Sequence, residues 1–290
     1  MTPLRVEILR FLAELRFLSL PQIARLCCPS ARQDLSEKNA RRHMRALFDA
    51  GLVDVLPVSR AALAPLGTPN DASLLYGSAP NVYCPTAPGL EALYRTGLIE
   101  KELLKRAAPN YGPKNSLFLA HELRVRDVRV WLETAAKVLG GGQKVLRWQA
   151  GSDAALEAGA SRTVRPDAWF VYSLGRRENR EAVLVGLVEV DCGTERGDRR
   201  WQEKLAAYES LFSGEALRAA TGYVNARVLV ITPDEKRRDQ LAQLLFSRSE
   251  TTAPRFWLAR QELLLQPGLA CADWRRPGRS VLEALITTNL

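Results

Sequence analysis

The chain has 290 residues, of which 47% are hydrophobic and 25% charged, and this composition fits one large domain or two ordinary ones and excludes wholesale disorder. The 41 Lys and Arg residues exceed the 32 Asp and Glu residues, and the net charge of +9 favours a polyanionic partner such as nucleic acid. Five cysteines without a Cys-x-x-Cys pair predict no disulfide framework or zinc site, and no apolar run approaches the ~20 residues that cross a bilayer, so we expect a cytoplasmic protein without a membrane partner.

Three short helices are predicted at the start of the chain. Apolar residues recur at helical spacing over residues 4–18, which predicts an amphipathic first helix. A second helix is predicted over 20–26 with Ser19 as its N-cap, and a third over 36–47 with Ser36 as its N-cap.

A β-hairpin is predicted after these helices. Strand-type runs cover 52–56 and 81–85, and a closing helix is expected over 87–94. The intervening residues 57–80 are rich in Pro, Ala, Gly and Ser, which suits an extended and mobile wing. This order predicts a winged helix-turn-helix DNA-binding domain over residues 1–95.

The third helix occupies the position of a recognition helix and is strongly basic. A row of cations on a helix is most often an ordinary solvated face, but here its place in the predicted domain favours contact with DNA. The candidate DNA-binding residues are Lys38, Asn39, Arg41, Arg42 and Arg45.

A second domain is predicted after a linker over residues 96–115 and is expected to cover 116–290. Its fold class is α/β (equally describable as α+β), with an α/β sandwich built on a mixed central sheet. The tail after residue 266 is expected to be loop-rich. The predicted elements are a helix over 117–139, strands over 144–148, 167–172 and 183–190, a helix over 200–212, a strand over 226–232, a helix over 234–246 and a strand over 255–259.

Three carboxylates stand at the ends of two apolar strands. Asp167 opens one strand, and Glu189 and Asp191 close the next. Carboxylates beside an apolar core repel one another and are costly to desolvate unless a cation or protons satisfy them. Hard oxygen donors of this kind select Mg²⁺ or Mn²⁺, so all three are candidate metal ligands. The ordinary alternative is that Asp167 caps a turn and that Glu189 forms a salt bridge with Arg165 or Arg196.

The order of these residues resembles that of restriction-endonuclease-like nucleases of the PD-(D/E)xK type. In that fold an acid on the first helix, a Pro-Asp and an acid-x-Lys converge on Mg²⁺, and Glu122 is the candidate helix acid here. The chain departs from the pattern because Asp191 stands where the lysine should be. Lys204 on the following helix is the candidate replacement.

A closer resemblance, over nearly the whole chain, is to the replication-relaxation family of plasmids and integrative elements, which is related to the MobC-type relaxases. The residues that carry it are His121-Glu122-Leu123, Arg165-Pro166-Asp167-Ala168, Glu189-Val190-Asp191-x-Gly193-Thr194-Glu195, and Lys204 with Tyr208. The chain has only two histidines, so a three-histidine relaxase site is excluded.

The resemblance implies a DNA-handling protein of plasmid or mobile-element replication or transfer. Its partner would be double-stranded DNA with an origin-type site, and a homodimer is a further expected assembly. The implied activity is Mg²⁺- or Mn²⁺-dependent nicking, with a catalytic set of Glu122, Asp167, Glu189, Asp191, Lys204 and Tyr208. Tyr208 is either a residue that packs and orients the site or a covalent nucleophile. The alternative function is a non-catalytic initiator or transcriptional regulator whose nuclease-like domain is degenerate and contacts DNA or protein.

Overall fold

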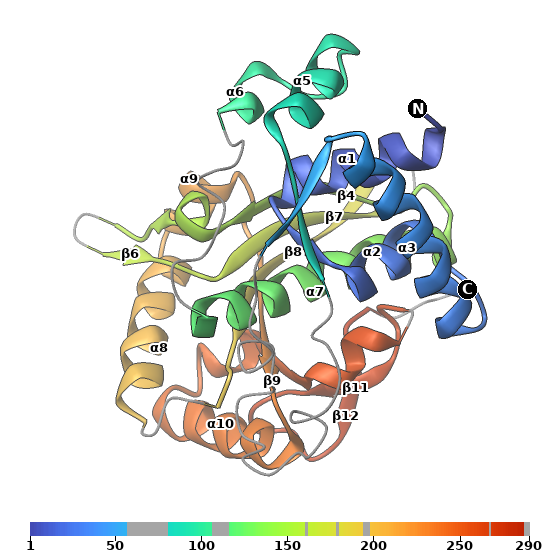
Figure 1. Cartoon of the computed structure of the whole chain (residues 1–290). Helices are drawn as coiled ribbons and strands as arrows, with labels where there is room; N and C mark the ends of the chain where they lie inside the picture. The colour runs from blue at the N-terminus through green and yellow to red at the C-terminus, as the bar shows by residue number, and fades with distance from the viewer. Residues whose placement is uncertain are drawn as a thin grey trace. The chain divides into compact units, whose positions relative to one another are not determined.

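The structure is a computed structural model that describes residues 1–56, 81–105, 116–159, 162–177, 180–193, 198–266 and 268–286 (Figure 1). It confirms the predicted α/β class and the mixed central sheet. The described residues form two compact units, of which the first ends at Val130 and the second begins at Trp131. In the described part of the chain, no helix is both long and apolar enough to cross a membrane.

The N-terminal unit begins with three helices and a short strand. These are α1 (Pro3–Leu15), β1 (Leu18–Ser19), α2 (Leu20–Cys27) and α3 (Gln33–Asp49). Ser19 is the N-cap of α2, as predicted: its hydroxyl accepts from the Gln22 backbone N–H, and the Gln22 side chain accepts from the Ser19 N–H. This reciprocal capping box satisfies two backbone donors that the helix start leaves unpaired.

Helix α3 begins at Gln33, so the prediction that Ser36 is its N-cap is wrong. Ser36 lies in the first turns of the helix and is buried. Its hydroxyl donates to the carbonyl oxygens of Ala24 at 3.1 Å and Cys28 at 2.6 Å. The side chain therefore binds α3 to the end of α2 instead of closing the start of its own helix.

An antiparallel three-stranded sheet also belongs to the N-terminal unit. Strand β3 (Val82–Pro85) pairs with β1 on one side and with β2 (Val53–Leu56) on the other. Helices α5 (Ala87–Arg95) and α6 (Lys101–Leu104) follow. The predicted wing over 57–80 lies outside the described residues, and the winged-helix identification stays a prediction.

The long helix α7 (Ser116–Leu139) contributes to both units, because the division between them falls between Val130 and Trp131. The sequence placed the whole helix in the second domain. In the structure, however, Leu119 and Leu123 pack into a buried cluster with Phe17 of the N-terminal unit. The first half of α7 is thus part of the N-terminal core.

The second unit is built on a seven-stranded sheet in the order β12-β11-β10-β9-β8-β7-β4. Its strands are β4 (Lys144–Ala150), β7 (Ala168–Arg177), β8 (Arg180–Val190), β9 (Arg227–Thr232), β10 (Phe256–Arg260), β11 (Ala272–Arg275) and β12 (Leu282–Ala284). Strands β8, β9 and β10 are parallel neighbours, and the other pairs are antiparallel. The last two strands lie in the tail that was expected to be loop-rich.

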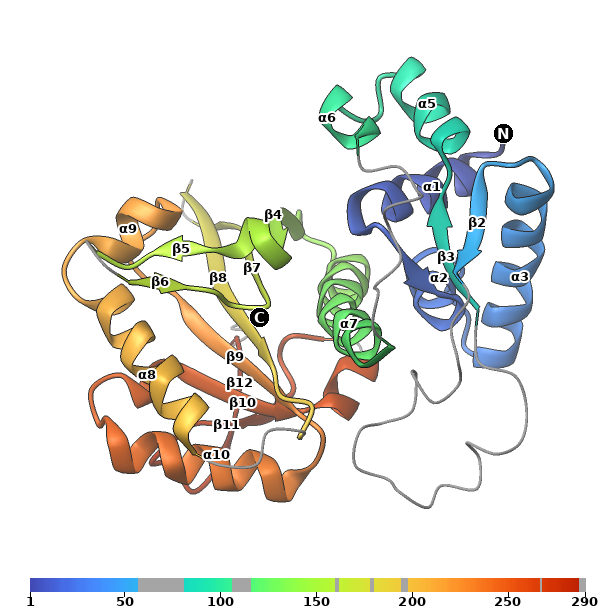
Figure 2. The same cartoon turned by 60° about the vertical axis from the view of Figure 1, so that its left-hand side comes forward.

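Helices α8 (Arg199–Phe212) and α10 (Glu235–Arg248) lie together on one face of this sheet (Figure 2). Alternate residues of β7, Trp169 and Val171, share the buried cluster beneath them with Leu205 of α8 and Leu241 of α10. From α7, Trp131 packs against Trp274 of β11, with ring centroids 6.0 Å apart. Smaller elements are β5 (Leu156–Glu157) paired with β6 (Thr163–Val164), α9 (Ala216–Thr221), and 3₁₀ turns at Gly151–Ala154, Ala253–Arg255 and Gln261–Leu265.

Candidate functional site

The structure brings Asp167 and Glu189 to the same edge of the large sheet. Strands β7 and β8 are antiparallel with Ala168 opposite Val188, so the residue before β7 lies beside the residue after Val188. The Asp167 N–H donates to the Val188 carbonyl at 2.9 Å, and Asp167 Oδ2 accepts from the Val190 N–H at 2.7 Å. The backbone pairing therefore holds the Asp167 carboxylate next to the end of β8.

Glu189 is the centre of a buried hydrogen-bonded group. Its side chain is 2% exposed; Oε2 accepts from Lys204 Nζ at 2.6 Å, and Oε1 accepts from the Tyr208 hydroxyl at 2.7 Å. Lys204 and Tyr208 are four residues apart on α8 and so face the same side of the helix. Burial raises the pKa of Glu189 and the nearby Asp167 raises it further, while Lys204 and Tyr208 act in the opposite direction. Lys204 thus points at the acidic pair.

Tyr208 is fully enclosed. Its ring packs edge-on against Phe256 at 5.4 Å and stacks with Phe212 at 6.1 Å, and its hydroxyl donates to Glu189. Burial and the neighbouring carboxylates hold the pKa of Tyr208 well above its ordinary value of 10.0. A nucleophile needs access to the phosphate and a lowered pKa. These properties favour the packing and orienting role of Tyr208 over the nucleophilic one.

Asp191 has a different environment from Glu189, although the two residues are close in sequence. Asp191 Oδ1 accepts from the Gly193 N–H at 2.6 Å. Its Oδ2 accepts from Trp201 Nε1 at 3.0 Å and from Arg237 at 3.0 Å (Nε) and 2.8 Å (Nη2). Both oxygens are therefore engaged by protein donors, and a guanidinium balances the charge.

These contacts decide which residues fit a divalent cation. Among the described residues, no group of three or more His, Cys, Asp and Glu side chains is arranged to hold a metal ion. Asp191 does not suit the predicted role, because three donors from Trp201 and Arg237 converge on its Oδ2, whereas each oxygen of Glu189 accepts one hydrogen bond, from Lys204 or Tyr208. Asp167 and Glu189 are adjacent hard oxygen donors of the type that Mg²⁺ and Mn²⁺ accept. The fit is thus to a two-carboxylate site with Lys204 beside it.

The remaining predictions for this site fall elsewhere. Glu122 belongs to the N-terminal unit, where its Oε2 lies 2.7 Å from Arg126 Nη1 within an i,i+4 ion pair. The alternative salt bridge of Glu189 with Arg165 is not formed, because the partner of Glu189 is Lys204. Arg196 and the Thr194-Glu195 extension lie outside the described residues.

Trp201 and Arg237 are two site residues that the sequence interpretation missed. The sequence spacing does indicate Trp201, because this residue precedes Lys204 by three positions and Tyr208 by seven and so shares their helix face. Nothing in the sequence pattern indicates Arg237. It lies on α10, and only the packing of α10 beside α8 brings it to Asp191.

The candidate nucleic-acid interface is the exposed face of α3. Lys38, Arg41, Arg42 and Arg45 follow the i, i+3, i+4, i+7 spacing of a single helix face, and all four are exposed. Arg41 and Arg45 form surface ion pairs with Glu37 at 3.2 Å and Asp49 at 2.9 Å. Such exposed pairs contribute little to stability, so a phosphate can replace their acidic partners at low cost.

The five predicted residues on α3 are not equivalent. Lys38 and Arg42 form no ion pair or hydrogen bond with any described residue, and both side chains are exposed. Asn39 is exposed as well and lies on the flank of this face. Among the described residues, the α3 face therefore carries two cations outside ion pairs, Lys38 and Arg42, beside the ion-paired Arg41 and Arg45, with Asn39 at its flank.

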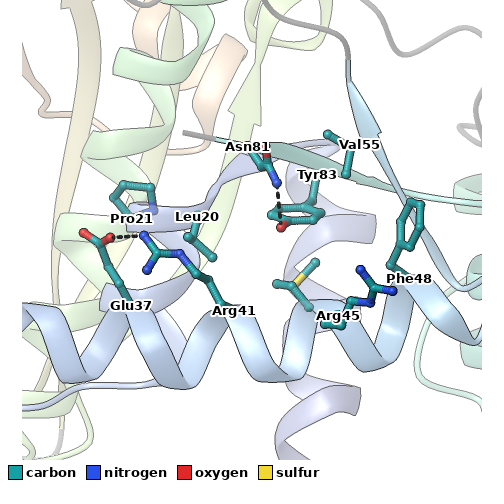
Figure 3. Close-up of a pocket in the computed structure, with 10 residues that line it drawn as sticks. Leu20, Pro21, Glu37, Arg41, Arg45, Phe48, Val55, Asn81 and Tyr83 are labelled. Carbon is teal, nitrogen blue, oxygen red and sulfur yellow. Dashed lines mark hydrogen bonds and ion pairs between the residues drawn. The ribbon is translucent and has the colours of Figure 1, made fainter. Parts of the chain in front are cut away.

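A groove of about 620 Å³ runs along one side of this face (Figure 3). Its apolar wall includes Phe48, which is 43% exposed, and its polar edge includes Arg41 and Arg45. Tyr83 from β3 contributes a hydroxyl that accepts from the Asn81 side-chain amide at 3.2 Å. The remaining lining residues are Leu20, Pro21, Glu37, Met44 and Val55. This combination of apolar walls and guanidinium groups suits the sugar and phosphate of a nucleic-acid strand.

A family model described as replication-relaxation matches residues 9–226, which is more than half of the chain. The match begins in α1 and ends directly before β9, so it contains α3 and the group formed by Glu189, Lys204 and Tyr208. Comparisons with curated proteins and with solved structures find no match. The chain belongs to the replication-relaxation family.

Proposed function

We propose that the protein binds double-stranded DNA at an origin-type site of a plasmid or mobile element, with α3 as the helix that contacts the duplex. The observation that carries this proposal is the face formed by Lys38, Arg41, Arg42 and Arg45, which is exposed and borders the groove. Membership of the replication-relaxation family supports the setting in replication.

The test is binding of cognate origin duplex and of a shuffled duplex, measured by fluorescence anisotropy across a range of salt. Lys38→Ala combined with Arg42→Ala should weaken binding, because phosphate contacts are lost and fewer counterions are released. A charge-matched control combines Arg95→Ala on α5 with Lys101→Ala on α6, both exposed. Equal loss in both double variants would show that net charge alone, and not α3, accounts for binding.

We also propose a second function, metal-dependent nicking of the bound DNA by the second unit. It is favoured by one observation, the 2.6 Å contact of Lys204 with a buried carboxylate that lies beside Asp167. Mg²⁺ or Mn²⁺ held by Asp167 and Glu189 would supply Lewis-acid activation of a phosphate and of a water molecule. Lys204 would neutralise charge that develops on the phosphate, and the Tyr208 hydroxyl would keep Glu189 oriented.

Supercoiled plasmid carrying cognate origin DNA, incubated with Mg²⁺ or Mn²⁺, tests the nicking proposal. Conversion to the open-circular form should depend on the metal and should be lost with Asp167→Asn. The same variant should lose the rise in melting temperature that the metal gives the wild type, since the cation stabilises only the folded site that binds it. DNA binding without conversion or metal response would favour the non-catalytic initiator or regulator.

A further inference from the structure

Asp191 connects three elements of the second unit. It follows the last residue of β8, accepts from Trp201 in the first turn of α8 and accepts from Arg237 near the start of α10. The Asp191 side chain is 2% exposed, and that of Arg237 is 18% exposed. Two guanidinium N–H groups and the indole N–H donate to Asp191 Oδ2, and the Gly193 N–H donates to Oδ1, so this buried carboxylate is satisfied without a metal ion.

Three side chains along α8 contact the two carboxylates at the end of β8. Trp201 contacts Asp191, and Lys204 and Tyr208 contact Glu189. On the helix these three residues share one face at i, i+3 and i+7, and Glu189 and Asp191 are two positions apart in an extended segment, so they project to the same side. Asp191 therefore holds the start of the same helix whose next turns present the lysine and tyrosine.

We propose that Asp191 is a positioning residue, which with Arg237 and Trp201 sets α8 so that Lys204 reaches Glu189. The proposal rests on the proposed function of the Asp167–Glu189–Lys204 group. It assigns Asp191 a role that differs from metal ligation, and it brings Arg237 and Trp201 into the site.

The two possible roles of Asp191 predict opposite effects of Asp191→Asn on the stability of the metal-free protein. If Asp191 were one of three clustered ligands, Asp191→Asn would relieve repulsion among carboxylates and the folded state would gain stability. If Asp191 is instead the partner of Arg237, the same substitution leaves a partly buried guanidinium without its counter-charge. We expect Asp191→Asn to raise the unfolding equilibrium constant at least about tenfold in EDTA, and Arg237→Met to do the same.

A double-mutant cycle between Asp191→Asn and Lys204→Met separates positioning from a merely local structural role. Both variants and their combination are unfolded in urea at neutral pH in EDTA. If Asp191 positions Lys204, the effect of Lys204→Met on the unfolding constant should shrink at least about threefold in the Asp191→Asn background. Arg199→Gln, which breaks only the exposed Arg199–Glu203 pair on the same helix, is the control and should leave that effect unchanged. Trp201→Phe removes the indole N–H donor and keeps a smaller, six-membered aromatic ring, so the cycle can be completed with this variant if Asp191→Asn does not fold.

Two results would overturn the proposal. The first is an Asp191→Asn protein as stable as the wild type that has lost the metal-dependent rise in melting temperature, which would identify a ligand. The second is strict additivity of Asp191→Asn, and of Trp201→Phe, with Lys204→Met. A wild type without any metal response would refute the cation site alone, because the cycle is measured without metal and still decides the role of Asp191.

Discussion

The ammonium of Lys204 lies 2.6 Å from Glu189 Oε2, and the carboxylate that it contacts is buried at the end of a central strand. Lys204 therefore supplies, from α8, a positive charge to the sheet edge at which Asp167 is also placed. The sequence position at which the PD-(D/E)xK pattern has its lysine holds Asp191, whose partner is Arg237.

Lys204→Met should affect both stability and nicking. Removing one partner of a buried ion pair leaves Glu189 uncompensated, and we expect the free energy of unfolding to fall by about 3 kcal/mol at neutral pH. In origin-plasmid assays we expect a loss of ~10²-fold or more in nicking rate, because one electrostatic stabiliser of the transition state is removed. DNA affinity, measured by anisotropy, should change little. A variant that nicks at the wild-type rate would exclude Lys204 from the chemistry.

Tyr208→Phe removes one hydroxyl and retains the aromatic packing with Phe212 and Phe256. Glu189 then loses one of its two hydrogen bonds, so the free energy of unfolding should fall by about 1–3 kcal/mol. Nicking should persist at a reduced rate, and no protein–DNA adduct should appear on denaturing gels of the wild type. Trapped covalent DNA that disappears with Tyr208→Phe would restore the nucleophilic role.

Glu189→Gln should change how stability depends on pH in EDTA. The pKa of Glu189 is raised above its ordinary value of 4.5, so the folded protein holds this proton more tightly than the unfolded chain. Its contribution to stability is complete below the unfolded pKa and is lost as pH rises through the folded pKa. Gln does not titrate, so the free energy of unfolding of Glu189→Gln, relative to the wild type, should increase over that interval. Urea titrations at several pH values test this, and a constant difference would contradict the raised pKa.

Phe48 and Leu35 offer a matched pair on α3, with 43% and 42% of their surfaces exposed. Phe48 lines the groove and Leu35 does not. If a DNA strand lies in the groove, Phe48→Ala should weaken duplex binding several-fold, since the ring contacts the sugar, while Leu35→Ala should have no effect. Thermal melting of both variants checks that folding is preserved. Equal affinities for the two variants would place the DNA strand outside the groove.

A fragment ending before α7 should fail to fold, because the N-terminal core needs the first half of this helix. Leu119 and Leu123 complete the cluster around Phe17, and the buried Arg126 donates to the Leu15 carbonyl at 2.8 Å. We expect residues 1–130 to give a cooperative melting transition and DNA binding, and residues 1–115 to give neither. A folded, DNA-binding 1–115 fragment would show that these contacts are dispensable.

The sequence was sufficient for features that depend on local chemistry. Helical spacing and Ser19 located α2, because a capping box is formed by residues three apart. Apolar runs located the central strands that Asp167 opens and Glu189 closes, and the helical interval between Lys204 and Tyr208 placed both on one face. The resemblance to the family that the chain proved to belong to came from motif residues, such as Pro166-Asp167 and Glu189-Val190-Asp191, and not from these periodicities.

Features that depend on which elements become neighbours could not be read from the sequence. Ser36 looks like a cap but lies inside α3, because its hydroxyl meets the end of α2. Asp191 looks like a third ligand, yet the packing of α10 beside α8 brings Arg237, 46 residues away, to its carboxylate. A buried carboxylate binds the strong hydrogen-bond donor that lies nearest to it, and long-range packing determines which donor that is.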